Sequence, residues 1–272
     1  MFDIPKFGFN VFSCMTKLKH TIVAALIAVA FTSGAFAGST TKPIGPDISL
    51  APKSDLTGSL ETSLVSNYTY HGRVLDSNPV VVPKLSLAYP LFTGGSLQLS
   101  TEQIVGTSGS SLYRSKYNLG LALGLGRLTV TPGYEIKAYP GRDGTNSQGV
   151  NGRVSLNDEG FLPVTLNPYV YVSRAVDPKG GTYYEAGILP TKKLGKLAVS
   201  VPVSVGAGSS KYYTTTNKDL KYAFTGAGLA LVYNVTDRFA LKASSIYYNT
   251  DETLNNASNS FVQNSAGVSV SF

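Results

Sequence analysis

The sequence predicts an all-β fold: a transmembrane, antiparallel, up-and-down β-barrel of about twelve strands over residues 57–272. Three observations predict it. A short apolar segment near the N-terminus resembles an export signal, apolar and polar residues alternate along most of the chain, and the charges fall on one side of that alternation. Charged residues make up 14% of the chain, against about 25% in ordinary soluble domains. Low charge without apolar runs of transmembrane-helix length suits strands that have one apolar face.

Residues 1–37 are predicted to be a secretory signal peptide. Lys17 and Lys19 precede an apolar run over residues 22–31, and the triplet Ala-Phe-Ala follows at residues 35–37. A basic region, an apolar region of about 7–15 residues and an A-x-A cleavage site define such a peptide. The apolar run is too short to cross a bilayer, which takes about 20 residues.

Removal of the signal peptide limits the chemistry that the mature chain can perform. Met15 is the expected initiator, Gly38 the expected mature N-terminus, and residues 38–56 an irregular periplasmic arm. Cys14 leaves with the signal region, so the mature chain has no cysteine for a disulfide, a nucleophile or a metal site. His71 remains as the one histidine, and no metal or other cofactor is expected. The mature net charge of about +5 is scattered, which argues against nucleic acid as a partner.

Alternation with a period of two residues is nearly continuous beyond the arm. It is clearest over residues 117–125 and 197–205, where one face is Leu, Val or Tyr and the other Ala, Gly, Ser, Asn or Pro. The predicted strands cover residues 58–70, 80–91, 96–106, 115–125, 128–138, 148–156, 162–173, 182–190, 197–206, 222–234, 239–249 and 260–272. The connections alternate between short turns and longer polar segments, the longer ones at 71–79, 107–114, 139–147, 174–181, 207–221 and 250–259. Short periplasmic turns, longer external loops and an even strand count are typical of outer-membrane barrels, and they place both termini in the periplasm.

The charged residues within the strands support this interpretation. Every one of them falls on the face opposite the apolar residues, where it is expected to line the lumen. These residues are Glu61, Lys84, Glu102, Lys116, Glu135, Lys137, Arg153, Glu185 and Lys242. A charge on the lipid face costs about 2–4 kcal/mol at the midplane, so a membrane imposes this sorting. A soluble β-sandwich also alternates, but it needs neither an export signal nor such strict sorting.

Aromatic and small residues refine the prediction. Six aromatic residues share the outward parity, most of them near strand ends, where aromatic girdles meet the membrane boundary: Tyr68, Tyr70, Tyr89, Tyr134, Tyr233 and Phe239. His71 is expected to be a solvated side chain at the end of the first strand. Many inward residues are small, which favours an open and narrow lumen: Gly120, Ala122, Gly124, Gly133, Ala198, Ser200, Gly226 and Gly228.

Two segments carry a resemblance to known proteins. The C-terminal alternation of Val268, Val270 and Phe272 looks like the last strand of outer-membrane proteins, which implies the barrel-assembly machinery as a partner beside membrane lipid. Residues 64–73 (LVSNYTYHGR) are similar to the first strand of the porin-like proteins sometimes called the TorF family, which typically reads Ser-Asp-Tyr-x-Phe-Arg-Gly. Asn67, Tyr70 and His71 replace the acid, Phe and Arg of that pattern. The resemblance implies an outer-membrane barrel of ill-defined transport function and brings no catalytic residues.

Three functions are compatible with the sequence. The first is a channel for passive diffusion of small hydrophilic solutes, and the second is a closed barrel that acts as an adhesin or structural partner through its external loops. The third is a lipid hydrolase of the outer membrane, for which His71 is the one candidate base. His71 lacks a serine at the alternate position on its strand, and we expect no enzyme. The solute and the oligomeric state are not encoded in any motif.

Overall fold

The computed structural model describes residues 55–107, 112–140, 146–160, 164–177, 180–209, 212–213, 220–252, 254–255 and 259–272. The chain divides into two compact units, Met1–Lys42 and Pro43–Phe272, and every described residue belongs to the second. The predicted signal peptide and residues 38–54 of the predicted arm lie outside the described residues.

The regular elements of the described residues are all β-strands. They are β1 (Thr57–Val65), β2 (Tyr68–Tyr70), β3 (Arg73–Asp76), β4 (Val80–Phe92), β5 (Gly95–Gly106), β6 (Leu112–Leu125), β7 (Leu128–Ala138), β8 (Ser147–Leu156), β9 (Tyr169–Asp177), β10 (Gly181–Ile188), β11 (Thr191–Leu194), β12 (Leu197–Ser200), β13 (Val203–Ser209), β14 (Leu220–Asn234), β15 (Phe239–Thr250) and β16 (Ser260–Ser271). Among the described residues, no helix is long and apolar enough to cross a membrane.

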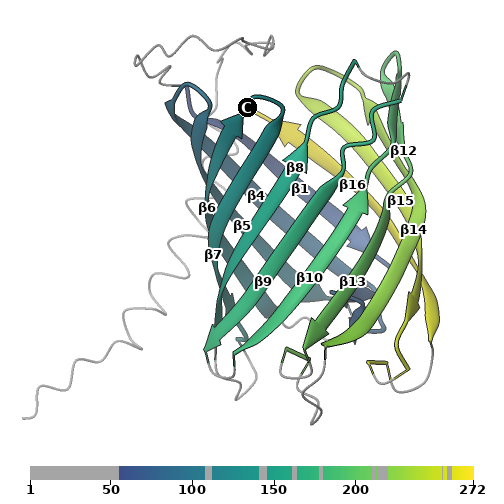
Figure 1. Ribbon diagram of the computed structural model, residues 1–272. Coiled ribbons are helices and arrows are strands. Elements are labelled where there is room, and N and C mark those ends of the chain that lie inside the picture. Colours follow the sequence, from purple (N-terminus) through teal and green to yellow (C-terminus); the bar gives the residue numbers. More distant parts are fainter. Residues whose placement is uncertain are drawn as a thin grey trace, which may run out of the picture. The chain divides into compact units, whose positions relative to one another are not determined.

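All strands except β2 and β3 form one closed antiparallel barrel, which confirms the predicted fold class (Figure 1). Successive staves of the barrel pair with one another, and β1 pairs with β16, with Leu60 opposite Val270. Gly58 and Phe272 exchange both backbone hydrogen bonds, at 2.7 and 2.9 Å. Both ends of the barrel domain therefore lie at the same rim, and the sheet has no free edge there.

Two of the twelve barrel strands are interrupted by proline. β10 and β11 are the two halves of one strand, and β12 and β13 are the two halves of the next, with breaks at Pro190 and Pro202. Proline has no N–H to donate to a β-ladder. The breaks lie at the same level, because the Val201 N–H donates to the Pro190 carbonyl at 2.9 Å. Counting each interrupted pair as one strand gives the predicted twelve.

The outer surface is apolar. Tyr117 and Leu119, in β6, are 42% and 49% exposed, whereas their neighbours Asn118 and Gly120 face the other way and are less exposed. The same alternation recurs in β7, where Tyr134 and other apolar side chains are exposed and the charged residues between them are buried. A continuous belt of exposed apolar residues suits contact with lipid.

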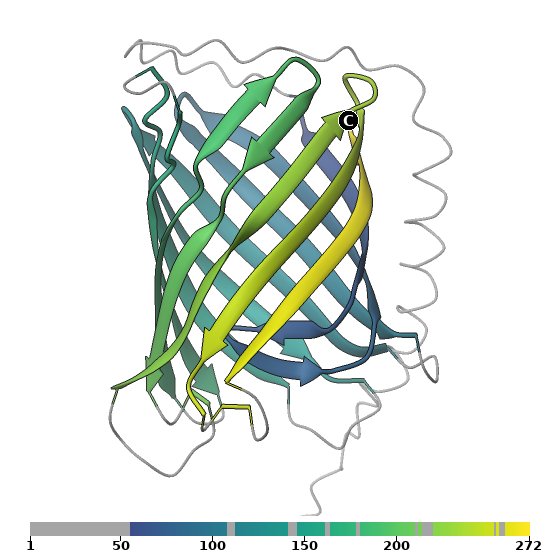
Figure 2. The ribbon, with the colours of Figure 1, turned by 90° about the vertical axis from the view of Figure 1, so that its right-hand side faces the viewer.

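The prediction of the first strand, residues 58–70, is wrong over its second half. β1 ends at Val65, and residues 68–76 fold back as a separate hairpin, β2–β3, which lies inside the barrel (Figure 2). We call residues 66–79 the inner hairpin. It occupies the rim that carries the longer connections, opposite the rim with the chain end (Figure 2). The predicted external loop at 71–79 therefore lies entirely within this hairpin.

The seventh strand also starts later than predicted, at Tyr169 instead of residue 162. Asp158 explains the difference: its carboxylate accepts the N–H groups of Leu166 and Asn167, both at 2.8 Å, and these two groups are lost to a β-ladder. The same hydrogen bonds, that from Asn167 first, lower the pKa of Asp158. Most other strand boundaries differ from the prediction by three residues or fewer.

Candidate functional site: a constriction inside the barrel

The inner hairpin turns through two residues. Tyr70 pairs with Arg73, and the residues between them, His71 and Gly72, have φ angles of 52° and 81°. Positive φ at both central positions is the mark of the two-residue turn that best matches the twist of a hairpin. Glycine adopts this conformation without strain; it is uncommon for other residues, among which Asn, Asp and His adopt it most often. Gly72 also lies against the Phe224 ring, which leaves no room for a side chain.

The hairpin spans the lumen from one wall to the other. It leaves the wall at the end of β1 and returns to it at β4. Its tip contacts β9 and β10 through the His71 ring, which stacks on Tyr171 with ring centres 6.0 Å apart and lies 3.8 Å from Tyr183. Around the ring of strands, β9 is six strands from β1 in either direction. The tip therefore touches the wall opposite its own origin.

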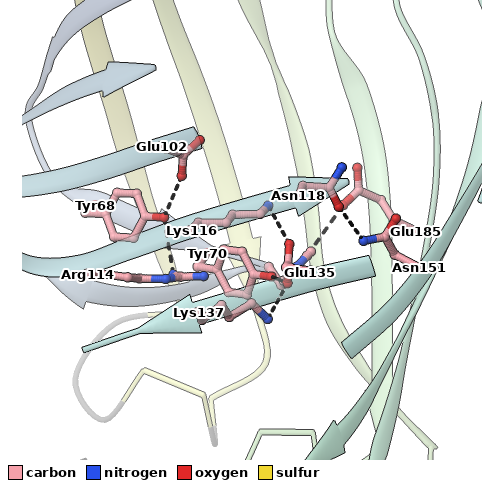
Figure 3. Close-up of polar contacts among 11 residues, drawn as sticks. Tyr68, Tyr70, Glu102, Arg114, Lys116, Asn118, Glu135, Lys137, Asn151 and Glu185 are labelled. Atoms are coloured by element: carbon pink, nitrogen blue, oxygen red, sulfur yellow. Dashed lines mark hydrogen bonds and ion pairs between the residues drawn. The ribbon is translucent and has the colours of Figure 1, made fainter. Parts of the chain in front are cut away.

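One side of the hairpin packs against cationic side chains of β6 and β7 (Figure 3). The Arg114 guanidinium stacks on the Tyr70 ring, with Cζ 3.9 Å from the ring centre, and Lys137 Nζ lies 4.7 Å from the same centre. Arg114 Nη1 also donates to the Tyr68 hydroxyl at 3.2 Å, and that hydroxyl donates to Glu102 at 3.2 Å. Cation–π contacts of desolvated groups are worth about 2 kcal/mol each, so these contacts hold the hairpin firmly against β6 and β7.

Glu135 is the centre of the same cluster. Its carboxylate pairs with Lys116 at 2.8 Å and with Lys137 at 2.7 Å, and it accepts a hydrogen bond from the Tyr70 hydroxyl at 3.2 Å. The Glu135 side chain is 2% exposed. A buried carboxylate needs such partners, because an unpaired buried charge costs several kcal/mol. The hairpin tyrosine is thus bonded to the ion pairs of the wall.

The tip of the hairpin inserts into a cage of tyrosines. The His71 ring contacts Tyr171 and Tyr183 of the wall and Tyr212 of the connection after β13. Its Nδ1 lies 4.0 Å from Glu185, which also accepts hydrogen bonds from the hydroxyls of Tyr169 and Tyr183, each at 2.5 Å. Burial, and then the nearby cations Lys137, Lys116 and Arg114, hold the pKa of His71 well below its ordinary value. The imidazole is therefore neutral at pH 7, and the prediction that it is a solvated strand-end side chain is wrong.

The returning half of the hairpin is fixed by two loops. Asn255 accepts the Val74 N–H at 2.8 Å and donates to the Gly72 carbonyl at 2.9 Å. Tyr213 donates its hydroxyl to the His71 carbonyl at 2.8 Å, and its own carbonyl accepts from Arg73 at 3.4 Å. Both buried apolar clusters of the described residues lie beside the hairpin, one around Tyr68 and one around Tyr183 and Phe224. Tight packing is thus concentrated at this rim.

The cross-strand register places the predicted site residues on shared levels. Glu61, Lys84, Glu102 and Lys116 stand opposite one another on four successive strands, with alternating charge. Residues directly opposite in a ladder point to the same face. Lys137 is opposite Lys116 and extends the row.

The remaining predicted residues form two smaller groups. Lys242 pairs with Glu61 at 2.5 Å, and both side chains remain about one-third exposed. Arg153 and Glu185 both stand opposite Tyr171, and the Arg153 guanidinium lies 3.9 Å from the centre of the Tyr169 ring. That all nine predicted residues line a path for solutes stays a prediction.

Sequence reasoning missed three important residues of the constriction. Tyr68 and Tyr70 were expected in an outer aromatic girdle, but they belong to the inner hairpin, so their predicted outward orientation is wrong. Arg114 belongs to β6, although the predicted strand begins at residue 115. It faces the same side as Lys116, and a strand extended by a few residues towards the N-terminus would have included it. The Gly72 turn was the available signal for the hairpin, because a glycine after two strand-like residues suits a two-residue connection.

No group of three or more His, Cys, Asp or Glu residues that could hold a metal ion occurs in the described part of the chain. Within the same residues, no serine hydroxyl is hydrogen-bonded to His71, whose neighbours are tyrosines and Glu185. The described part of the chain therefore offers no activated serine of the kind a lipid hydrolase requires.

Comparisons with known proteins agree with the architecture. No protein-family model matches the chain, and no curated protein matches its sequence. The fold is similar to that of the NanC porin, at 11% identity and a TM-score of 0.50, over 78% of this chain and 98% of that one. It is also similar to an outer-membrane channel from Pseudomonas putida F1, at 10% identity and a TM-score of 0.54, over 84% of this chain and all of that one. The chain therefore has the fold of outer-membrane β-barrels.

Proposed function

We propose that the chain is an outer-membrane channel for passive diffusion of small hydrophilic solutes, and that the inner hairpin sets the size limit of its lumen. The observation that carries this proposal is the position of the hairpin. It crosses the lumen at one rim, while the Lys242–Glu61 pair, on β15 and β1 of the wall, stays about one-third exposed. A barrel of eight strands is filled by side chains, whereas sixteen or more leave a wide aqueous channel, so twelve strands leave room that one hairpin can restrict.

The polarity of the two rims supports an orientation. The longer connections and the hairpin lie at the rim opposite Phe272, and outer-membrane barrels have their longer loops outside. The proposed channel is therefore constricted at its external mouth, with both termini in the periplasm. The alternation at Val268, Val270 and Phe272 supports assembly by the barrel-assembly machinery in the same orientation. Similarity to the TorF-type proteins adds an expectation of transport without naming a solute.

Conductance across a planar bilayer tests the proposal. The refolded mature chain should give discrete steps of small conductance, and replacement of residues 67–78 by a short Gly-Ser linker should enlarge the steps several-fold. Heat-modifiable gel mobility verifies that each variant is folded. Equal steps from both proteins would show that the hairpin is not the constriction, and no steps from either would contradict the channel itself.

The closed adhesin-like barrel is the second candidate. It is favoured by the dense packing of the hairpin, in which the Tyr183 ring and the Arg114 guanidinium are almost fully buried. Steps that appear only after removal of the hairpin would support this alternative over the open channel.

A further inference from the structure

Three cations lie beside the Tyr70 ring: Arg114, Lys116 and Lys137. Of these, only Arg114 has no carboxylate partner among the described residues. The carboxylate of Glu135 is occupied by Lys116 and Lys137, and Glu102 is bonded to Tyr68. Arg114 Nη1 donates to the Tyr68 hydroxyl, but Nε and Nη2 have no hydrogen-bond partner within the described residues. The whole residue is 1% exposed. Unsatisfied buried donors on a charged group are costly, so they call for a reason other than stability.

The two free donors are the pair that suits an oxyanion. Nε–H and Nη2–H lie along the same edge of the guanidinium plane, and this edge binds both oxygens of a carboxylate or phosphate group at once. Arg114 Cζ lies 3.9 Å from the centre of the Tyr70 ring, a contact that uses neither of these donors.

The charges around the fork favour the same ligand. Arg114, Lys116 and Lys137 place three positive charges beside the carboxylates of Glu135 and Glu102, which leaves one positive charge in surplus. A desolvated site with this surplus attracts an anion more strongly than the same residues would in water. A monatomic anion would be attracted by the positive charge alone, whereas an oxyanion would also accept hydrogen bonds from both donors.

We propose that Arg114, with Lys116 and Lys137 beside it, binds the carboxylate or phosphate group of a permeating solute at the constriction. The proposal rests on the channel function and names its substrate class, a small solute that carries an oxyanion. Solvent does not reach the guanidinium in this arrangement, so the oxyanion enters only when the hairpin shifts. A ligand that binds only the shifted hairpin moves the equilibrium towards that conformation. Binding of the oxyanion therefore widens the lumen.

Direct binding tests the site independently of transport. Isothermal titration of the refolded mature protein with inorganic phosphate and, separately, with succinate should show saturable binding of at least one probe. Arg114→Lys keeps the charge and loses the fork, so we expect roughly tenfold weaker binding. Arg114→Gln should abolish it. Lys193→Gln, which alters an exposed lysine of β11 outside this cluster, should bind as the wild type does.

Two results would overturn the site. One is absence of binding of both probes to folded wild-type protein, and the other is equal affinity for Arg114→Lys and Arg114→Gln. A preference for one probe would identify the class of oxyanion. Single-channel recordings then separate this proposal from the channel function: binding without conductance upholds the site and rejects the channel. Conductance without binding upholds the channel and rejects the site.

Discussion

Acidification should release the inner hairpin from the wall, through His71. In the packed hairpin its imidazole faces Tyr171, Tyr183 and Glu185 of the wall, Tyr70 and Tyr212, and the cations Arg114, Lys116 and Lys137. Burial and the three cations lower its pKa, and the Glu185 carboxylate, 4.0 Å away and already bonded to two tyrosines, does not offset them. A released hairpin returns His71 to water and to a pKa near about 6.5.

The sign and size of the effect follow from linkage. The packed state binds fewer protons than the released state, so its stability is complete above about pH 6.5 and falls as the pH drops below that value. Each pH unit then removes about 1.4 kcal/mol while the packed imidazole stays neutral. Between pH 6.5 and 4.5 the ratio of packed to released hairpin should fall by up to about 50-fold, the limit for a packed imidazole that stays neutral throughout.

Single-channel recording at pH 7.5, 6.5, 5.5 and 4.5 measures this transition. The wild type should show longer and larger openings as the pH falls. His71→Asn should show little dependence, because asparagine has no titratable group and tolerates the left-handed turn conformation. The reasoning is refuted if His71→Asn keeps the full pH dependence, or if acid closes the wild-type channel.

Three further predictions concern the barrel. Spin labels at Leu119, which is 49% exposed, and at Lys84 should report lipid and water respectively, and equal accessibility would contradict the assignment of faces. Deletion of Phe272 removes two backbone hydrogen bonds to Gly58 at the closing pair, so the folded, heat-modifiable form should largely disappear from the outer membrane; wild-type amounts would exclude the assembly role. Glu135→Gln removes the counter-ion of the buried Lys137 and of the partly buried Lys116, which should cost about 3–5 kcal/mol of hairpin packing and enlarge the conductance steps. Unchanged steps would show that these ion pairs do not hold the hairpin.

The barrel could be predicted from the sequence because its rule is local. Side chains of a strand alternate between lipid and lumen, so the faces of Leu119 and Asn118 can be inferred without knowledge of the rest of the chain. Strand count and loop lengths follow from the same period. The strand count also survives the two proline breaks: the predicted strand at 197–206 runs through Pro202, whereas the one at 182–190 ends at Pro190, so that β11 was missed as its second half.

The constriction could not be predicted because contacts between residues far apart in the sequence determine it. Tyr68 and Tyr70 keep the parity of the strand that precedes them, and nothing in the alternation reveals that the chain leaves the wall after Val65. Their position is decided by partners far along the chain, such as Arg114 and Glu135. A pattern read over about ten consecutive residues contains no information on such contacts.

The turn residue itself indicates that the hairpin is built for its contacts with the wall. Glycine would serve the first position of this turn without strain, whereas a non-glycine residue with a φ of 52° costs of the order of 1 kcal/mol. His71 nevertheless occupies the position, with its ring 3.8 Å from both Tyr70 and Tyr183. A local conflict of this kind persists only where the surroundings compensate it, and such conflicts concentrate at functional sites. Asparagine would keep the turn and lose both the aromatic contacts and the titratable group. The contacts of His71 with the opposite wall, rather than the turn, therefore account for its presence at the tip.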